Sequence, residues 1–195
     1  MARGRPREFD TDDALDAALR VFWQRGYEGA SLTALSEAMG INLPSLYGAF
    51  GNKEQLFAKV VDRYIQQPAS YLLRALEQPT ARDVARSALA GAIDMVMQPG
   101  TGDGCLLVHG ALAASPGCEA IRDQLSARRA RAEAAVRQRL ERARVGGDLP
   151  AAADPGELAA YLMTVIWGMS VQAAGGASRT QLEQIARVAL DAWPT

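Results

Sequence analysis

The stretch GINLPSLYGAFGNKE, residues 40–54, decides how the N-terminal part of this chain folds. Asn42 can cap a helix, because its side-chain oxygen accepts a hydrogen bond from an otherwise unpaired amide of the first turn. Pro44 is tolerated in that first turn, where no amide hydrogen is needed. Leu46 and Phe50 then lie on one face, four residues apart. The stretch predicts a helix of only two turns, which is shorter than a core helix normally is.

Helices are predicted on both sides of this short helix. Ser31 can cap a helix that runs to Gly40, where glycine allows the left-handed backbone of a tight turn. On the other side Asn52, with Gln55 three residues later, resembles a capping box. It begins a further helix that reaches at least Gln67. Three helices joined by tight turns are therefore expected here.

The remainder of the chain is also predicted to be helical, because apolar residues recur at spacings of three and four and no strand pattern competes. Upstream, a helix capped by Thr11 should end at Gly26. Downstream, clusters of Gly, Pro, Ser and Asp separate further helical segments. The segments are 81–98, 105–115, 117–144, 154–174 and 179–192. The predicted fold class is all-α.

Composition limits the kinds of protein that this chain can be. Its 195 residues are 49% apolar and 22% charged, which is enough to bury a core. With 21 basic and 22 acidic residues, the net charge of −1 gives no sign of a nucleic-acid partner, whose phosphates usually need Lys and Arg. Two Cys and a single His do not form a zinc site, and they favour free thiols in a reducing compartment. We expect neither a metal nor a cofactor.

Two segments bear on the cellular location. The start MARGRPREFD is basic, but no apolar run follows it, which argues against a signal peptide. Residues 158–178 carry no charge and are long enough to span a bilayer. Thr164, Ser170 and Gln172 dilute their apolar character, which favours a helix buried in the protein or in an oligomer. We expect a cytoplasmic protein that does not contact a membrane.

Residues 31–57, SLTALSEAMGINLPSLYGAFGNKEQLF, closely resemble the DNA-binding domain of the TetR/AcrR family. The pattern L-Y-x-x-F-x-x-K-E-x-L at 46–56 is specific, and with its surroundings it covers about a quarter of the chain. The resemblance implies a helix-turn-helix, in which the first helix crosses the DNA backbone and the second lies in the major groove. It also implies a transcriptional repressor that binds a palindromic operator as a homodimer and is released by a small-molecule effector.

The resemblance implies which residues contact DNA. Those that would face phosphate or bases from the two helices are Ser31, Thr33, Leu43, Pro44, Ser45 and Gly48. Tyr47 and Lys53 resemble the phosphate-contacting Tyr and Lys of the family. Taken singly, Tyr47 is as readily a packed aromatic residue and Lys53 a solvated one, but jointly, with the spacing intact, they favour DNA binding. Ala49 departs from the family, which often has an aromatic residue or His there, so one phosphate contact is expected to be missing.

Arginines outside the helix-turn-helix offer further contacts. RGRPR, residues 3–7, places Arg3, Arg5 and Arg7 before the first helix, where they suit an arm in a narrow minor groove. The alternative is a disordered basic tail. The segment 122–144 contains eight Arg, which suggests either a second nucleic-acid surface or, as we favour, a solvated helix with intrahelical ion pairs.

The resemblance also implies a division of the chain. Residues 1–51 would form the arm and the helix-turn-helix domain, 52–77 a connecting helix, and 78–195 a helical bundle for ligand binding and dimerisation. The last two long helices would pair with those of a second copy, a role that suits the apolar segment 158–174. Residues expected to line the effector pocket are Met95, Cys105, Leu106, His109, Met163 and Trp167. The alternative is that these Met, Trp and His side chains simply belong to the core.

Two other functions were weighed against this one. An enzyme is disfavoured, because we find no paired carboxylates, no persuasive Ser-His-acid order and no phosphate-binding loop; PGTGDG, residues 99–104, lacks a following Lys. A purely structural helical module would leave the pattern at 46–56 unexplained. A thiol-based sensor is the alternative within the family, because GDGCLLVHGALAASPGC resembles a segment of a branch in which a Cys senses oxidants or electrophiles.

In that alternative Cys105 is the sensor. It opens an expected helix, whose N-terminus lowers the pKa of a thiol, whereas the carboxylate of Asp103 opposes this effect. Cys118 is a candidate resolving partner. The competing interpretation is that Cys105 is a small buried residue packed beside Leu106.

Overall fold

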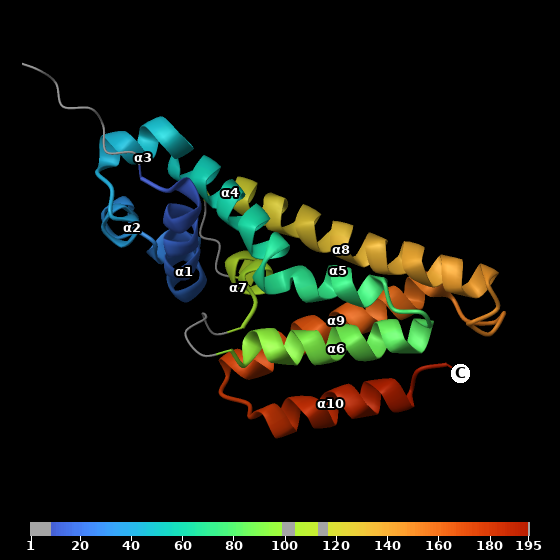
Figure 1. Ribbon diagram of the computed structural model, residues 1–195. Helices are drawn as coiled ribbons and strands as arrows, with labels where there is room; N and C mark the ends of the chain where they lie inside the picture. Colours follow the sequence, from blue (N-terminus) through green and yellow to red (C-terminus); the bar gives the residue numbers. More distant parts are fainter. Residues whose placement is uncertain (1–8, 99–103, 113–116, 195) are drawn as a thin grey trace, which may run out of the picture.

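The computed structural model describes residues 9–98, 104–112 and 117–194. Within these residues the chain contains ten α-helices, one short 3-10 helix and no strand, which confirms the predicted all-α class (Figure 1). The helices are α1 Thr11–Gly29, α2 Leu32–Met39, α3 Leu43–Phe50, α4 Lys53–Gln66, η1 Pro68–Ser70, α5 Tyr71–Leu76, α6 Ala81–Val96, α7 Leu106–Leu112, α8 Glu119–Val145, α9 Pro155–Ala174 and α10 Arg179–Asp191.

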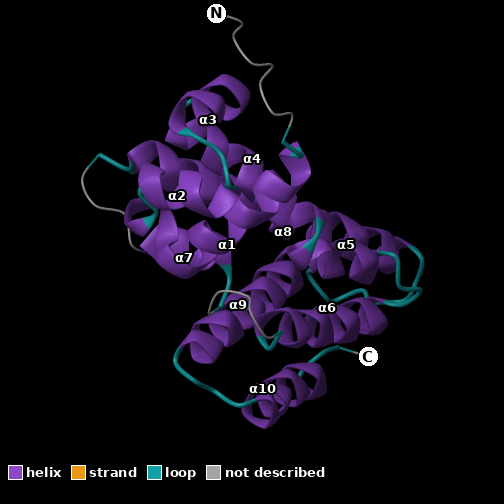
Figure 2. Cartoon of the chain, turned by 60° about the vertical axis from the view of Figure 1, so that its left-hand side comes forward, coloured by secondary structure: helices purple, strands orange, loops and turns teal. Residues whose placement is uncertain are grey.

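The helices form two groups that share α4. Helices α1, α2 and α3 gather at one end of the molecule, with α3 outermost, and α4 leads from α3 into the larger group (Figure 1). There α5, α6, α8, α9 and α10 run roughly alongside one another, and α8 is the longest. Helix α10 lies at the outer edge, where it contacts α6 and α9 (Figure 2). The arrangement leaves α3 at one extremity and α10 at another (Figure 1).

The boundaries of the short helix follow from the predicted caps. The Oδ1 atom of Asn42 accepts a hydrogen bond from the amide of Ser45 at 2.9 Å. Asn52 and Gln55 form a complete capping box, in which each side chain accepts from the backbone amide of the other, at 2.8 and 3.0 Å. Gly40 ends α2 with a φ of 65°, a left-handed conformation that glycine adopts at little cost. Helix α3 is therefore held at both ends by local hydrogen bonds.

Two of the expected boundaries were wrong at α1. Asp10, not Thr11, caps α1, because its carboxylate accepts from the amides of Asp12 and Asp13. At Gly26 the backbone turns to a φ of 67°, but helical structure resumes and ends only at Gly29. Glycine there bends the element instead of ending it.

The connecting helix expected over 52–77 is not continuous: α4 ends at Gln66, and the separate helix α5 was not predicted. Pro68 begins a 3-10 turn, as expected of a helix-ending proline, but a separate helix, α5, follows at once. Tyr71 on α5 packs against α6 where Gly91 has no side chain: a Cβ atom there would lie 2.6 Å from the Cβ of Tyr71. The close approach of α5 to α6 therefore depends on a glycine far away in the sequence.

Three of the eight arginines of α8, namely Arg128, Arg129 and Arg139, bond to other parts of the chain. Arg139 donates to the carbonyl oxygens of Leu76, Gln78 and Pro79, just after α5, and Arg129 donates to the carbonyl of Leu107. An intrahelical ion pair joins Arg137 to Glu141. These arginines attach α8 to its neighbours, more than the expected solvated helix would.

Candidate nucleic-acid interface and ligand pocket

Helix α3 presents two different faces. Leu46 and Phe50 are buried against α2 and α4, as their spacing predicted. On the outer face Leu43 and Tyr47 are 38% and 48% exposed, which is unusual for large apolar side chains on so short a helix. Pro44 lies on the same exposed surface and Ser45 is half-buried. The side chains that were expected to read bases are thus free to meet a partner.

Gly48 adds a second unusual feature to this face. It lies inside α3, where glycine is less favourable than alanine by about 1 kcal/mol. An added Cβ atom would have nothing within 4 Å, so packing inside the chain does not require a glycine there. A glycine at an exposed helical position allows another molecule to approach the backbone closely.

The neighbouring predicted contacts surround α3. Ser31 and Thr33 are exposed at the start of α2, where the Oγ atom of Ser31 accepts from the amide of Ala34. Lys53, at the start of α4, is half-buried, and its Nζ atom lies 4.5 Å from the centre of the Tyr27 ring. Burial lowers the pKa of Lys53, while the negative charges of Cys118 and Glu28 raise it by a smaller amount. The ring holds the ammonium group close to the start of α4.

Arg3, Arg5 and Arg7 lie outside the described residues. The sequence analysis missed a different cation, Lys59. Its Nζ atom donates to the carbonyl of Ala49 at 3.0 Å and lies 5.3 Å from the centre of the Phe50 ring. Lys59 follows Lys53 by six residues on α4, and only the fold shows that it closes the C-terminal end of α3.

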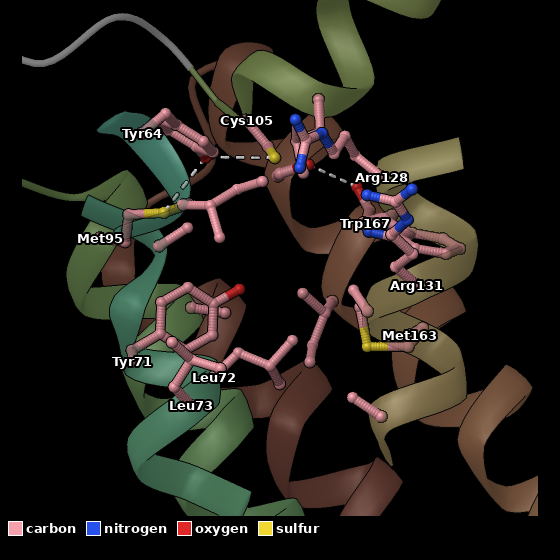
Figure 3. Close-up of a pocket in the computed structure, with 18 of the residues that line it drawn as sticks. Tyr64, Tyr71, Leu72, Leu73, Met95, Cys105, Arg128, Arg131, Met163 and Trp167 are labelled. Carbon is pink, nitrogen blue, oxygen red and sulfur yellow. Dashed lines mark hydrogen bonds between the residues drawn. The ribbon is translucent and has the colours of Figure 1, made fainter. Parts of the chain in front are cut away.

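A second candidate site lies in the larger group of helices. A cavity of about 250 Å³ is lined by residues of α4, α5, α6, α7, α8 and α9 (Figure 3). Four of the six expected residues line it, namely Met95, Cys105, Met163 and Trp167. The sequence analysis missed further lining residues, among them Tyr64, Tyr71, Leu107, Arg128 and Arg131.

Leu106 and His109 do not line the cavity. Leu106 is 1% exposed and packs into the core, so the next residue, Leu107, faces the cavity instead. His109 lies against Gly104, where an added Cβ atom would be 2.6 Å from its Nε2 atom. One position along a helix turns a side chain by about 100°, which is enough to move it from a cavity into the core.

Cys105 is enclosed by other cavity residues. The hydroxyl of Tyr64 lies 3.2 Å from its Sγ atom and 3.3 Å from the Sδ atom of Met95. Burial raises the pKa of the Cys105 thiol, and the amides of Leu107 and Val108 lower it by a smaller amount. The start of α7 therefore lowers this pKa as expected, but desolvation of the thiolate is the larger effect, so the expected net lowering of the Cys105 pKa was wrong.

The possible partners of Cys105 are not joined to it. Cys118 directly precedes α8, where its Sγ atom donates to an oxygen of Glu28 at 3.6 Å. Both thiols are free. Asp103 lies outside the described residues.

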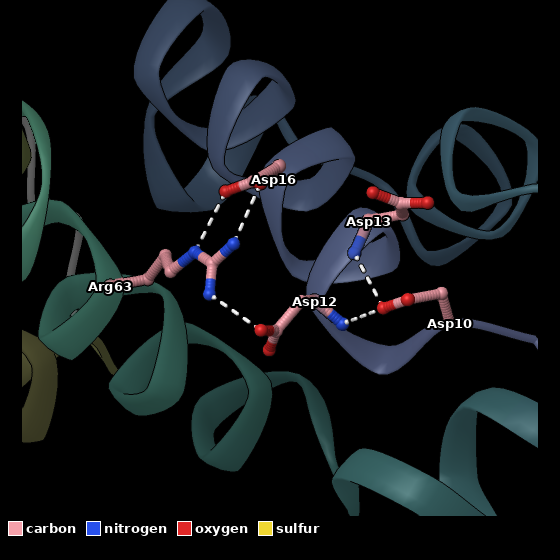
Figure 4. A network of polar contacts seen from close by, with 5 residues as sticks. All are labelled: Asp10, Asp12, Asp13, Asp16 and Arg63. Carbon is pink, nitrogen blue, oxygen red and sulfur yellow. Dashed lines mark hydrogen bonds and ion pairs between the residues drawn. The ribbon is translucent and has the colours of Figure 1, made fainter.

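Three consecutive residues of α4 connect the two candidate sites. Asp62 pairs with Arg128 of α8 at 2.5 Å. Arg63 donates two hydrogen bonds of 2.8 Å to the carboxylate of Asp16 and pairs with Asp12 at 3.2 Å, both on α1 (Figure 4). Tyr64 reaches the cavity. Helix α4 is thus attached to the cavity on one side and to α1 on the other.

Helices α9 and α10 each carry exposed apolar side chains. Tyr161 and Val171 are 39% and 45% exposed on α9, and Ile185 and Val188 are 38% and 62% exposed on α10. Gly168 lies between the first two, with nothing within 4 Å of an added Cβ atom. No helix in the described part of the chain is long and apolar enough to cross a membrane.

Comparison with known families gives a match to most of the chain. A profile described as bacterial regulatory proteins of the tetR family matches residues 14–60. A second profile, described as the C-terminal domain of tetracyclin repressor-like proteins, matches residues 69–189. The first match includes α3, and the second includes every cavity-lining residue except Tyr64 and Ile65.

Individual relatives agree with these profiles. The HTH-type transcriptional repressor ComR of Escherichia coli K12 is 38% identical over 195 residues, which are 99% of this chain and 93% of that protein. A solved structure of the TetR family regulator CifR, a cysteine mutant with 26-base-pair operator DNA, is 44% identical with a TM-score of 0.92, and covers 97% of this chain and 100% of that one. The reduced form of Escherichia coli NemR is 25% identical with a TM-score of 0.76, over 92% and 95% of the two chains.

Proposed function

Because this chain belongs to the TetR family of bacterial regulatory proteins, we propose that it binds a palindromic operator as a homodimer and leaves it when a small molecule enters the cavity. It is a DNA-binding transcriptional repressor and not an enzyme. We place it in the cytoplasm, where bacterial DNA lies. The division proposed from the sequence, with an arm and head over 1–51, a connector over 52–77 and a bundle over 78–195, fits these roles.

The outer face of α3 carries this proposal. Leu43, Pro44, Ser45 and Gly48 would contact base edges in the major groove, since they lie on the surface of a helix held outward by its own caps. Tyr47 and Lys53 would contact phosphate, together with Ser31 and Thr33. The arginines of the N-terminal arm would add minor-groove contacts. The solved complex of CifR with operator DNA, a structure with the same fold, supports the assignment.

The apolar face of α9 and α10 is our proposed dimer interface. Tyr161, Gly168 and Val171 follow one side of α9, and a glycine between two larger residues lets a second helix approach closely. A two-fold pairing of these helices would place two α3 helices on one side of the dimer. Two such heads read two half-sites, so a palindromic operator follows from the symmetry.

The cavity is our proposed effector site. Helix α4 reaches from the cavity to the DNA-binding head, so a ligand that favours one position of α4 changes the spacing of the two heads. An effector that binds better to the DNA-free spacing therefore releases the operator.

The dimer is the most direct test of this proposal. We expect the double variant Tyr161→Arg, Val188→Arg to be monomeric in light scattering and to lose most of its operator affinity, because charges would be buried in the pairing face. The operator is first selected from a random DNA pool with the wild-type protein. Val145→Arg is the matched control, since Val145 is 88% exposed at the end of α8, away from this face. A wild-type monomer, or a selected site without two-fold symmetry, would contradict the proposal.

A thiol response is a second candidate, favoured by the position of Cys105 in the cavity wall. Relatives have been solved as a cysteine mutant and in a reduced form. Because its pKa is raised, the thiolate fraction grows as the pH rises toward that pKa, so modification should be slow at neutral pH and faster at higher pH.

The test is operator release by N-ethylmaleimide at pH 7 and pH 8.5, in wild type, Cys105→Ser and Cys118→Ser. A response through Cys105 requires release that is faster at the higher pH, is lost in Cys105→Ser and is kept in Cys118→Ser. If wild type stays bound, or Cys105→Ser is released as readily, Cys105 is not the switch.

A further inference from the structure

We propose that the effector is a small apolar carboxylic acid, and that its carboxylate takes the place of Asp62 on Arg128. The inference rests on the proposed function, because it specifies the ligand of the same cavity and the event that ligand causes. Its basis is the distribution of charge around the cavity.

The walls of the cavity are predominantly apolar. Leu72, Leu76, Val96, Met163 and Ile166 contribute aliphatic surface from α5, α6 and α9. The volume of about 250 Å³ is near the lower end of the range for small-molecule sites. The ligand must therefore be small, with most of its surface apolar.

The charged groups at the cavity are all positive. Arg128 and Arg131 line it from α8, three residues apart and hence on one side of the helix, and Figure 3 shows both on the same side as Trp167. No Asp or Glu is among the described residues that line the cavity. An apolar cavity with two guanidinium groups at its edge suits an apolar acid, since a guanidinium binds a carboxylate through paired hydrogen bonds.

The two arginines differ in their partners. Arg131 makes no hydrogen bond or ion pair with another described residue, whereas Arg128 already pairs with Asp62. The side chain of Arg128 is 25% exposed and that of Asp62 is 48% exposed, so Asp62 can exchange its partner for water. A ligand carboxylate held by Arg131 would lie beside Arg128 and compete with Asp62 for it.

This exchange would act directly on α4. The Asp62–Arg128 pair attaches α4 to α8, while the adjacent Arg63 attaches α4 to Asp16 of α1. Loss of the first attachment with retention of the second would free α4 from the body but keep it with the DNA-binding head. The ligand would thus favour a displaced position of α4 by its own contact with Arg128.

Octanoate and 1-octanol are a suitable pair of probes, since they have the same alkyl chain length and differ in charge. Their binding to the DNA-free protein is measured by titration calorimetry. We expect octanoate to bind more tightly than 1-octanol. Arg128→Gln and Arg131→Gln should each weaken octanoate about tenfold or more, with little effect on 1-octanol. Arg137→Gln is the control, because it also removes an arginine ion pair from α8, with Glu141, but lies outside the cavity.

Asp62→Asn gives a result of the opposite sign. If the ligand and Asp62 compete for Arg128, this variant should bind octanoate several times more tightly than wild type, while 1-octanol is unaffected. A purely structural role of the ion pair would instead make Arg128→Gln and Asp62→Asn change binding in the same direction. Absent octanoate binding, equal binding of the two probes, or no gain in Asp62→Asn would overturn the proposal.

Operator release is measured separately, so that the two proposals fail in different ways. Octanoate should release the selected operator from wild type. Arg128→Gln lacks the ion pair with Asp62, so it should bind the operator more weakly than wild type without any ligand, and octanoate should change its operator affinity little. If a neutral compound releases the operator and octanoate does not bind, the repressor mechanism stands and the carboxylic acid is wrong. If octanoate binds as expected but the operator is unaffected, the exchange at Arg128 is not the switch.

Discussion

The DNA-binding head and the cavity are built in contrasting ways. The boundaries of α2, α3 and the start of α4 depend on hydrogen bonds between residues at most five apart in the sequence, at Ser31, Gly40, Asn42 and Asn52. The cavity is lined by residues from Tyr64 to Ser170, on helices that only the tertiary fold brings together. The head is a local unit with little room for variation, whereas the cavity can change its chemistry one side chain at a time. A regulator needs both, because operators require a fixed geometry and effectors differ.

The largest expected difference between the two regions is in how much a Leu→Ala substitution lowers the free energy of unfolding. Leu46 is fully buried between α2, α3 and α4, so Leu46→Ala should lower the free energy of unfolding by about 2–5 kcal/mol. Leu72 already faces the cavity and is half-buried, so Leu72→Ala should cost about 1–2 kcal/mol. Urea unfolding followed by circular dichroism measures both. Equal costs would show that the cavity is as closely packed as the head.

This difference also explains what the sequence could predict. The caps at Asn42 and Asn52 and the buried positions Leu46 and Phe50 are local features, and the structure places them as expected. The all-α class followed from the helical periodicity in the same way. At the start of α1 the prediction failed by one residue, because Asp10 and Thr11 are both good capping residues and only the backbone shows which one is used.

The cavity could be predicted only in part. Met95, Met163 and Trp167 stood out as large apolar residues on expected helices, but periodicity does not say which helix faces which. Arg128 and Arg131 were taken as part of a solvated arginine-rich helix, since their position at a cavity depends on the packing of α8 against α5 and α9. Helix α5 was missed because its close packing on α6 depends on Gly91, which is remote in sequence.

The connection between the two regions gives the next largest effect. Arg63→Gln removes the paired hydrogen bonds to Asp16 and the ion pair to Asp12, which attach α4 to α1. The Arg63 side chain is only 17% exposed, but its partners are more exposed, so we expect a loss of about 1–2 kcal/mol in unfolding free energy. Arg86→Gln, which breaks an exposed pair with Asp83, should cost less than about 0.5 kcal/mol in the same urea experiment. Equal losses would mean that α4 is not held to the head by Arg63.

A smaller effect, of opposite sign for folding and function, is expected at Gly48. Gly48→Ala should raise the free energy of unfolding by about 0.5–1 kcal/mol, because alanine is a better helix former and its Cβ atom meets no other atom. Operator affinity should fall, since the added methyl group would occupy the space where the DNA approaches. Thermal unfolding and fluorescence anisotropy with the selected operator measure the two effects. An unchanged affinity would show that α3 does not enter the groove at Gly48.

The smallest expected effect is a change in the salt dependence of operator binding, and it distinguishes the two lysines at the edge of the DNA-binding head. The chain has only two lysines, and both lie on α4. Lys53→Ala should reduce the slope of log affinity against log salt by about one unit, because one phosphate contact releases about one counterion. Lys59→Ala is the matched control, since the ammonium group of Lys59 is bonded to the carbonyl of Ala49 and should leave the slope unchanged. Tyr47→Phe removes a neutral donor, so it should weaken binding to all operator variants without altering the slope. The ring of Tyr27 holds Lys53 in place through a cation–π contact, and a bound phosphate must draw the ammonium group outward from it. If Lys53→Ala leaves the slope unchanged, the lysine stays on Tyr27 in the complex and has a structural role.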